Sequence, residues 1–152
     1  MAKRSTRKPA EAEVTPAATA LSPAEERNWA MLAHLSVLLN LFTGFLGPVA
    51  ALTIYLVYQP RSRYVAYQSL QALVFQLVWW VGAGAIVAGI WVVTGALSAV
   101  IVGLLCVPFA CVLTLLPGVA LVYGTYAAVE CSQGRDFRYW LIGDWVRGTL
   151  EH

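Results

Sequence analysis

The fold of this chain is decided by a run of 66 residues without a charged side chain, Tyr64–Val129: YVAYQSLQALVFQLVWWVGAGAIVAGIWVVTGALSAVIVGLLCVPFACVLTLLPGVALVYGTYAAV. A second uncharged run of 33 residues, Asn28–Pro60, precedes it. The hydrocarbon core of a bilayer is about 30 Å thick, and roughly 20 apolar residues of helix cross it. The two runs therefore predict one helical hairpin and one longer helical pair in a membrane.

Composition also indicates a membrane protein rather than a soluble domain. Hydrophobic residues make up 59% of the 152 residues and charged residues only 12%, too few for the surface of a soluble core of this size. Four of the ten Lys and Arg residues form a basic cluster near the N-terminus: Lys3, Arg4, Arg7 and Lys8. This cluster predicts contact with anionic lipid head groups. Because no base-stacking motif accompanies it, we expect no nucleic-acid partner.

The sequence divides into four parts. Residues 1–21 are rich in Ala, Pro and Thr and predict a disordered basic tail. Residues 22–131 hold the transmembrane domain, and residues 132–149 form a cytoplasmic or interfacial segment. Residues 150–152 resemble the start of a vector-encoded histidine tag and carry no functional interpretation.

The membrane domain is expected to be an all-α, polytopic four-helix bundle. Helical patterns run over 23–42, 48–58, 62–93 and 97–131. The first begins at a capping sequence, Ser22-Pro23-Ala24-Glu25. The second is only about 16 Å long at 1.5 Å per residue, so the first hairpin either spans a thinned membrane or is re-entrant. A turn is expected at Thr94-Gly95-Ala96, and Pro108 and Pro117 are expected to kink the fourth helix.

The distribution of basic residues predicts the topology. With four spans, all ten Lys and Arg residues lie on one side of the membrane. By the positive-inside rule, both termini of this multi-pass protein are then cytoplasmic, as expected for an inner-membrane protein. A fifth span, made by breaking the last helix at Pro117, would move Arg135, Arg138 and Arg147 to the outside, and is rejected for that reason.

A family resemblance is carried by four segments: Glu26–Leu35, Gly44–Pro48, Tyr64–Leu73 and Gly134–Tyr139. In order and spacing they resemble a family of small bacterial membrane proteins of unknown function, related to the Tic-twenty subunit of the chloroplast import machinery. The likeness covers Glu25–Val146. It implies a four-helix membrane domain, cytoplasmic termini, no established catalytic activity and, by extension, a role in protein import. That family often has His where this chain has Gln68 and Pro where it has Trp140, so no role of that His carries over.

Polar residues within the predicted spans are candidates for function. His34 is the only one that titrates near neutral pH. It can relay a proton or bind a polar ligand with Asn40, or it can be a neutral group bonded to Gln68, Gln71 or Gln76 that holds the first helix against the third. The structural role is favoured because a proton path needs a carboxylate or a second His, and the spans contain neither. The glutamines can likewise line a polar groove or join helices.

Two further sets of residues have an expected role. On the third helix, Gly82, Ala85 and Gly89 share an arc of about 60° with Gln71 and predict close helix packing, including self-association. Aromatic residues expected to anchor the protein at the membrane interface are Trp29, Tyr64, Tyr139, Trp140 and Trp145.

The sequence gives no support to an enzyme. Paired carboxylates, a nucleophile with its base, a phosphate loop and metal-ligand spacings are all missing from it, so we expect no catalysis, metal or cofactor. The leading hypothesis is a non-enzymatic scaffold or subunit of a membrane complex. Its partners would be anionic lipids and either a second copy or another membrane protein. The alternative is a small transporter or channel whose path runs past His34 and Gln71.

Overall fold

The computed structural model describes residues 20–150, and all the regular structure in this range is helical. The elements are α1 (Pro23–Leu35), a 3-10 turn η1 (Ser36–Leu39), α2 (Asn40–Thr43), α3 (Leu46–Tyr58), α4 (Arg63–Ser98), α5 (Val102–Leu113), α6 (Leu116–Ser132) and α7 (Gly143–Leu150). The expectation of an all-α fold is confirmed for these residues. The expected disordered tail, except for its last two residues, and the end of the suspected tag lie outside the described residues.

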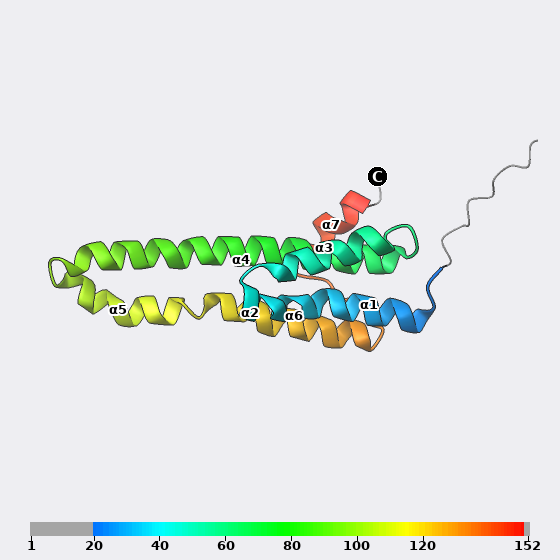
Figure 1. The fold of residues 1–152 in the computed structure, drawn as a ribbon, viewed down its shortest axis with the longest axis horizontal. Coiled ribbons are helices and arrows are strands. Elements are labelled where there is room, and N and C mark those ends of the chain that lie inside the picture. The colour runs from blue at the N-terminus through cyan, green and yellow to red at the C-terminus, as the bar shows by residue number, and fades with distance from the viewer. Residues whose placement is uncertain (1–19, 151–152) are drawn as a thin grey trace, which may run out of the picture.

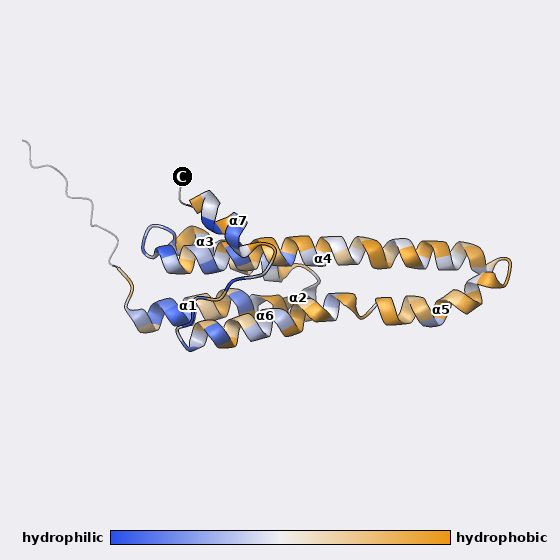
Figure 2. Ribbon diagram, turned by 180° about the vertical axis from the view of Figure 1, so that it is seen from behind, coloured by the Kyte–Doolittle hydropathy of each residue, from blue (hydrophilic) through white to orange (hydrophobic). Residues whose placement is uncertain are grey.

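The molecule is a long helical pair with a short helical hairpin packed beside one end (Figure 1). Helix α4 forms one arm and, with 36 residues, is about 54 Å long. Helices α5 and α6 return along it as the second arm. Each arm, Arg63–Ser98 and Val102–Ser132, is long and apolar enough to cross a membrane. Figure 2 shows the hydrophilic residues gathered at the end that holds α1, α3 and α7.

The starts of α1 and α4 follow local capping rules. Ser22 and Glu25 form the capping box that the sequence predicts, with the Glu25 N–H donating to Ser22 Oγ and the Ser22 N–H donating to the Glu25 carboxylate. Ser62 caps α4 by accepting from the Val65 N–H at 3.1 Å, and it donates to Glu26 Oε1 at 2.5 Å. The caps therefore tie the start of α4 to the first turn of α1.

The first predicted helix is interrupted, because the short hairpin closes tightly against it. Where a single helix over 23–42 is expected, α1 passes into the 3-10 turn η1 and the single turn α2. A Cβ on Gly47 would lie 2.7 Å from the Ser36 carbonyl oxygen and would collide with Gln76 Oε1. The Gly47 N–H donates to Asn40 Oδ1 at 2.9 Å. A glycine at this position lets α3 approach η1 and α4 at backbone contact.

The expected turn at 94–96 is wrong, since α4 continues through it to Ser98. Gly95 is tolerated within the helix, at a cost of about 1 kcal/mol relative to Ala. The chain reverses at Ile101 instead, a residue with φ of 69°. The controlling glycine is Gly103, where a Cβ would collide with the Thr94 carbonyl and the Ser98 N–H. Close approach of the two arms, rather than local turn propensity, therefore sets the position of the turn.

The predicted fourth helix is broken rather than only kinked. It divides into α5 and α6 at Thr114–Leu115, and Pro117 lies in the first turn of α6, where its missing N–H costs nothing. Pro108 lies inside α5. The indole N–H of Trp79 donates to the Leu116 carbonyl at 3.1 Å, so α4 satisfies a backbone group at the break.

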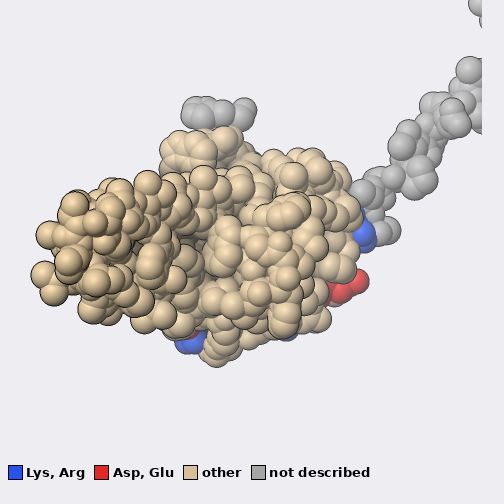
Figure 3. Space-filling view, turned by 60° about the vertical axis from the view of Figure 1, so that its left-hand side comes forward, with Lys and Arg blue, Asp and Glu red and all other residues tan. Residues whose placement is uncertain are grey.

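The surface of the arms is dominated by exposed apolar side chains, such as Val81 at 65%, Val92 at 72% and Leu105 at 83% exposure. The face drawn in Figure 3 is almost entirely uncharged. The clusters of buried core residues lie where the short hairpin, α6 and the C-terminal segment meet the first half of α4. Its aromatic members include Phe75, Phe137 and Tyr139.

Candidate functional site

The centre of the buried polar cluster is His34, which is 1% exposed. Its Nε2 lies 3.0 Å from Gln68 Oε1, and its Nδ1 lies 3.1 Å from the Tyr139 hydroxyl. An amide oxygen can only accept, so Nε2 carries the proton and Nδ1 accepts from Tyr139. Burial raises the pKa of the Tyr139 hydroxyl well above its usual range, which keeps it protonated as that donor. Both ring nitrogens of His34 are therefore occupied by hydrogen-bond partners.

Two glutamines of α4 extend this cluster to the C-terminal segment. Gln68 donates to Asp136 Oδ1 at 3.0 Å and to the Phe137 carbonyl at 3.2 Å. Gln71 donates to the same carbonyl at 3.0 Å and accepts from the Tyr139 N–H at 2.8 Å. The two amides thus satisfy backbone groups that would otherwise be buried without partners. They hold the segment that follows α6 against α4.

The other two polar candidates form a separate group at the turn of the short hairpin. Gln76 donates to Ser36 Oγ at 2.9 Å, and Asn40 donates to Gln76 Oε1 at 3.4 Å. The sequence interpretation grouped Asn40 with His34, whereas in the structure Asn40 bonds to Gln76 and Gly47. In residues 20–150 every buried side-chain nitrogen and oxygen has a hydrogen-bond partner. Each buried polar atom of both groups therefore has at least one hydrogen-bond partner, and a group of this kind is called saturated below.

Among the expected interfacial aromatics, Tyr139 is placed differently from the prediction. It is 3% exposed, and its ring stacks on Phe75 with centroids 4.0 Å apart. Because its hydroxyl bonds to His34, burial leaves no polar atom unpaired. Trp140 and Trp145 are 83% and 63% exposed, as an anchoring role requires.

The remaining two expected anchors lie at the charged end. Trp29 is half-buried and packs on Tyr58, with ring centroids 4.5 Å apart. The half-buried Tyr64 donates through its hydroxyl to the Arg135 carbonyl at 3.2 Å. Each of these two side chains therefore packs partly against the protein and keeps part of its surface exposed.

The stripe of small residues on α4 is covered at one end only. Gln71, at its beginning, is fully buried by the C-terminal segment. Gly82, Ala85 and Gly89 are exposed, and a Cβ on Gly82 or Gly89 would meet nothing within 4 Å. The part of the stripe beyond the short hairpin thus has no packing partner within residues 20–150.

Sequence reasoning missed the role of the segment after Gly134, which was expected to lie at the membrane surface. Buried Phe137 and Tyr139 alternate there with exposed Asp136, Arg138 and Trp140. This period of two is typical of an extended chain with one face buried. The alternation was visible in the sequence and is the signal that could have located these residues.

Charged side chains close this segment on its outer side. Arg147 of α7 pairs with Asp136 at 2.5 Å, and its guanidinium lies 4.7 Å from the ring centre of Tyr67. The hydrogen bond to Asp136 raises the pKa of Arg147 further, so it stays charged. Arg138 pairs with Asp144 at 2.5 Å. These ion pairs join the C-terminal segment to α7. Within residues 20–150, no group of three His, Cys, Asp or Glu residues is placed to hold a metal.

A small helical protein with two long apolar arms, joined at one end through a saturated polar cluster, belongs to the class of membrane-associated helical proteins. Residues 25–146 match the model of the MamF/MmsF family, described as the magnetosome magnetite crystal formation protein family. The chain belongs to this family. No curated protein and no solved structure shows significant similarity to it.

The family match corrects the resemblance to proteins related to the Tic-twenty import subunit, which is wrong. All four segments quoted for that resemblance lie within the matched residues 25–146. In the structure they supply the turn of the short hairpin and the polar cluster, which are features of architecture. Such features define a fold without specifying a biological role.

Proposed function

We propose that this chain is a non-enzymatic protein of the magnetosome membrane that supports magnetite crystal formation as a scaffold or subunit of a membrane complex. The observation that carries the proposal is the family match over residues 25–146. The structural support is the saturated polar cluster, whose hydrogen bonds join α1, α4 and the C-terminal segment. A scaffold needs such a rigid joint, whereas an enzyme needs reactive groups that reach a substrate.

The proposed membrane placement has α4 and α5–α6 crossing the bilayer as a pair. From Leu77 to Ser98, α4 is about 33 Å long, close to the thickness of a hydrocarbon core of about 30 Å. Helix α3 has 13 residues and is about 20 Å long. Because Gly47, at its start, packs on Gln76, the short hairpin ends where the apolar part of α4 begins. These lengths support a hairpin set into one leaflet rather than a second spanning pair.

The proposed orientation places the charged end in the cytoplasm. In the sequence, Arg61 precedes the long pair, Arg63 begins it and three arginines follow it, while the turn between α4 and α5 carries no charge. The positive-inside rule then places both termini on the cytoplasmic side. In this orientation the turn between α4 and α5, called the far turn below, lies on the opposite side of the membrane and has no carboxylate that could contact a mineral surface. We therefore expect the effect on crystal growth to pass through the membrane or through partner proteins.

The transport alternative gains no support from the geometry. The polar side chains that would line a path past His34 and Gln71 are saturated with hydrogen bonds. Between Leu77 and Val93, α4 carries only apolar and aromatic side chains and glycine. A path for ions or polar solutes needs polar groups along its length.

The proposed partner surface is the exposed part of the small-residue stripe. Small residues let helix backbones approach closely in lipid, where apolar side chains gain little from leaving lipid for protein. Gly82, Ala85 and Gly89 have no neighbour in the described chain that would block such an approach. A second copy of the chain or the helix of another membrane protein would pack there.

The function is tested by complementation in a magnetosome-forming host that lacks its own members of this family. Expression of this chain is expected to restore magnetite crystal size, measured by electron microscopy, with the protein recovered in the magnetosome membrane fraction. A matched control is the Gln68→Ala, Gln71→Ala double variant, in which the joint between α4 and the C-terminal segment is removed.

Two outcomes would contradict the proposal. The first is a wild-type chain that inserts into the magnetosome membrane but leaves crystal size unrestored. The second is flux of protons or iron through proteoliposomes of the purified chain that His34→Ala and Gln71→Ala abolish, which would establish the transport function instead.

A further inference from the structure

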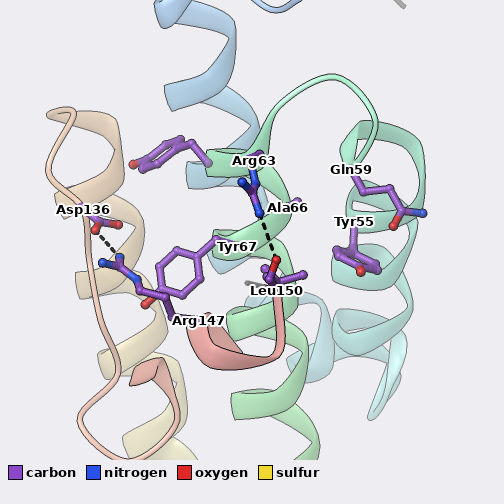
Figure 4. Close-up of a pocket in the computed structure, with 9 residues that line it drawn as sticks. Tyr55, Gln59, Arg63, Ala66, Tyr67, Asp136, Arg147 and Leu150 are labelled. Carbon is purple, nitrogen blue, oxygen red and sulfur yellow. Dashed lines mark hydrogen bonds and ion pairs between the residues drawn. The ribbon is translucent and has the colours of Figure 1, made fainter. Parts of the chain in front are cut away.

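A cavity of about 520 Å³ opens at the charged end between α3, α4 and α7 (Figure 4). Its charged lining residues are Arg63, Asp136 and Arg147, and Gln59 and three tyrosines, among them Tyr67, complete its polar lining. Two guanidinium groups and one carboxylate give this lining a net positive charge. The volume falls in the range of about 300 to 1,000 Å³ typical of small-molecule sites.

The two arginines of the cavity are held in place while their charge stays incompletely neutralised. Arg63 donates to the Leu150 carbonyl at 3.0 Å, a partner that fixes the side chain without cancelling its charge. Arg147 is oriented by Asp136 and by the ring of Tyr67. Each contact engages one nitrogen or one face of a guanidinium that carries five N–H donors. The N–H donors of two guanidinium groups can bind a ligand that carries several anionic oxygens.

The surroundings of the cavity distinguish a lipid from a soluble anion. Leu52 lies one turn before Tyr55 on the same face of α3 and is 39% exposed, and neighbouring Leu56 is 55% exposed. The polar cavity therefore continues into an apolar surface. A free phosphate would make no use of that surface, whereas the acyl chains of a lipid would cover it.

We propose that this cavity binds the phosphate head group of an anionic phospholipid, with Arg63 and Arg147 as its ligands and the acyl chains lying along the exposed face of α3. The inference rests on the membrane placement proposed above, in which the charged end lies at the head-group level. Basic pockets between helices on the cytoplasmic side of membrane proteins are suited to such head groups.

The test is lipid retention by the full chain in detergent, measured by native mass spectrometry during titration with phosphatidylglycerol or phosphatidylcholine. Wild-type protein is expected to retain phosphatidylglycerol preferentially. Arg63→Gln and Arg147→Gln should each weaken that binding about fivefold, as expected for about 1 kcal/mol per basic side chain. Arg138→Gln is the matched control, because it removes the same charge from the exposed pair with Asp144 outside the cavity.

A second variant separates loss of binding from loss of folding. Gln59→Trp keeps every charge and adds bulk at an exposed position of the cavity wall, so it should also weaken binding. Thermal unfolding shows whether each variant remains folded. The lipid site is overturned if phosphatidylglycerol is not preferred, if the three cavity variants bind it like wild type, or if Arg138→Gln weakens binding equally. Displacement of the lipid by excess inorganic phosphate would assign the cavity to a free phosphate and also overturn it.

This measurement is independent of crystal formation. If the wild-type chain restores magnetite crystals but retains no phosphatidylglycerol, the lipid site fails and the proposed function stands. If lipid is retained through Arg63 and Arg147 while crystals are not restored, the proposed function fails and the lipid site stands.

Discussion

At the scale of single residues, hydrogen-bond saturation explains why polar side chains are buried in so apolar a chain. His34, Gln68, Gln71 and Gln76 are all at most 1% exposed, and every polar atom among them has a partner. A buried polar group without a partner costs several kcal/mol when no water can reach it. Because each of these buried groups must lie beside its hydrogen-bond partner, the elements that carry the two groups must pack against each other.

Replacement of His34 tests this constraint. His34→Ala removes the partner of the Tyr139 hydroxyl and one of the two donors to Gln68 Oε1, the other being Gln71. It is expected to lower the unfolding free energy by about 2 to 4 kcal/mol. His34→Gln can accept from Tyr139 and donate to Gln68, so it should lose only about 1 kcal/mol. Thermal unfolding in detergent measures both. Equal losses of stability in the two variants would show that the hydrogen bonds of His34 do not stabilise the fold. Loss of function in both variants at full stability would indicate that function depends on protonation of His34.

Glycine at position 103 is the second residue-scale requirement. Gly103→Ala places a methyl group against the backbone of Thr94 and Ser98 and should destabilise the protein by about 1 to 3 kcal/mol. Gly95→Ala, in the open helix surface only eight residues earlier, is the control and should be neutral or stabilising by up to about 1 kcal/mol. Thermal midpoints of the two variants in one detergent give the comparison. A Gly103→Ala protein as stable as Gly95→Ala would show that the two arms do not approach closely at this turn.

At the scale of elements, the extended segment after α6 joins parts of the chain that are distant in sequence. It places Phe137 and Tyr139 between α1, α4 and α6. Its Phe137 carbonyl accepts from the Gln71 amide of α4, and its Tyr139 N–H donates to the oxygen of the same amide. An extended segment of this kind, without a sheet, takes the partners of its backbone groups from side chains. It should therefore be the first element to detach when they are removed.

Limited proteolysis tests the attachment of this segment. Gln71→Ala removes two hydrogen bonds to this segment, at the Phe137 carbonyl and the Tyr139 N–H. It is expected to accelerate trypsin cleavage at Arg135 and Arg138 severalfold. Ser132→Ala, at an exposed position before the segment whose hydroxyl donates to the Val129 carbonyl within α6, is the control. Equal cleavage rates in the two variants would show that the segment is held by other contacts.

The exposed stripe on α4 makes a prediction about association. Gly82→Leu and Gly89→Leu add side chains to the surface proposed for close packing and should weaken self-association in lipid severalfold, without loss of monomer stability because both positions are open. Fluorescence energy transfer between labelled copies in vesicles measures the effect. Val92→Leu, on an exposed position beside the stripe, is the control. A wild-type chain that stays monomeric in the same assay would direct attention to a different membrane protein as the partner.

At the scale of the whole molecule, the polar joint lies at one end and the apolar pair projects from it. This asymmetry is the basis of the proposed placement, with the long pair crossing the bilayer and the short hairpin entering one leaflet. The hairpin turn and the far turn, at opposite ends of the apolar part of α4, then meet different surroundings.

Cysteine accessibility in intact cells and inverted vesicles distinguishes the placements. In a background without the native cysteines, Val100→Cys at the far turn should react with a membrane-impermeant thiol reagent only from the outer side. Phe42→Cys, 87% exposed near the turn of the short hairpin, should react from neither side because it lies in lipid. Reaction of Phe42→Cys from the outer side would show that the short hairpin spans the membrane, and reaction of a tag at either terminus from outside would reverse the orientation.

The sequence by itself determined the all-helical class, the caps at Ser22 and the two apolar arms, because these follow from periodicity, local capping and the absence of charge. It also identified His34 and the glutamines as the polar residues to explain. Only the tertiary structure decided their partners, since Tyr139 lies 105 residues from His34 and reaches it through an extended segment without a helical pattern. The position of the far turn was decided in the same way, by the contact of Gly103 with Thr94 and Ser98 rather than by the turn propensity of Gly95. Local preferences fix where helices can form, whereas steric contact and hydrogen-bond saturation between distant residues decide where they end and what they bury.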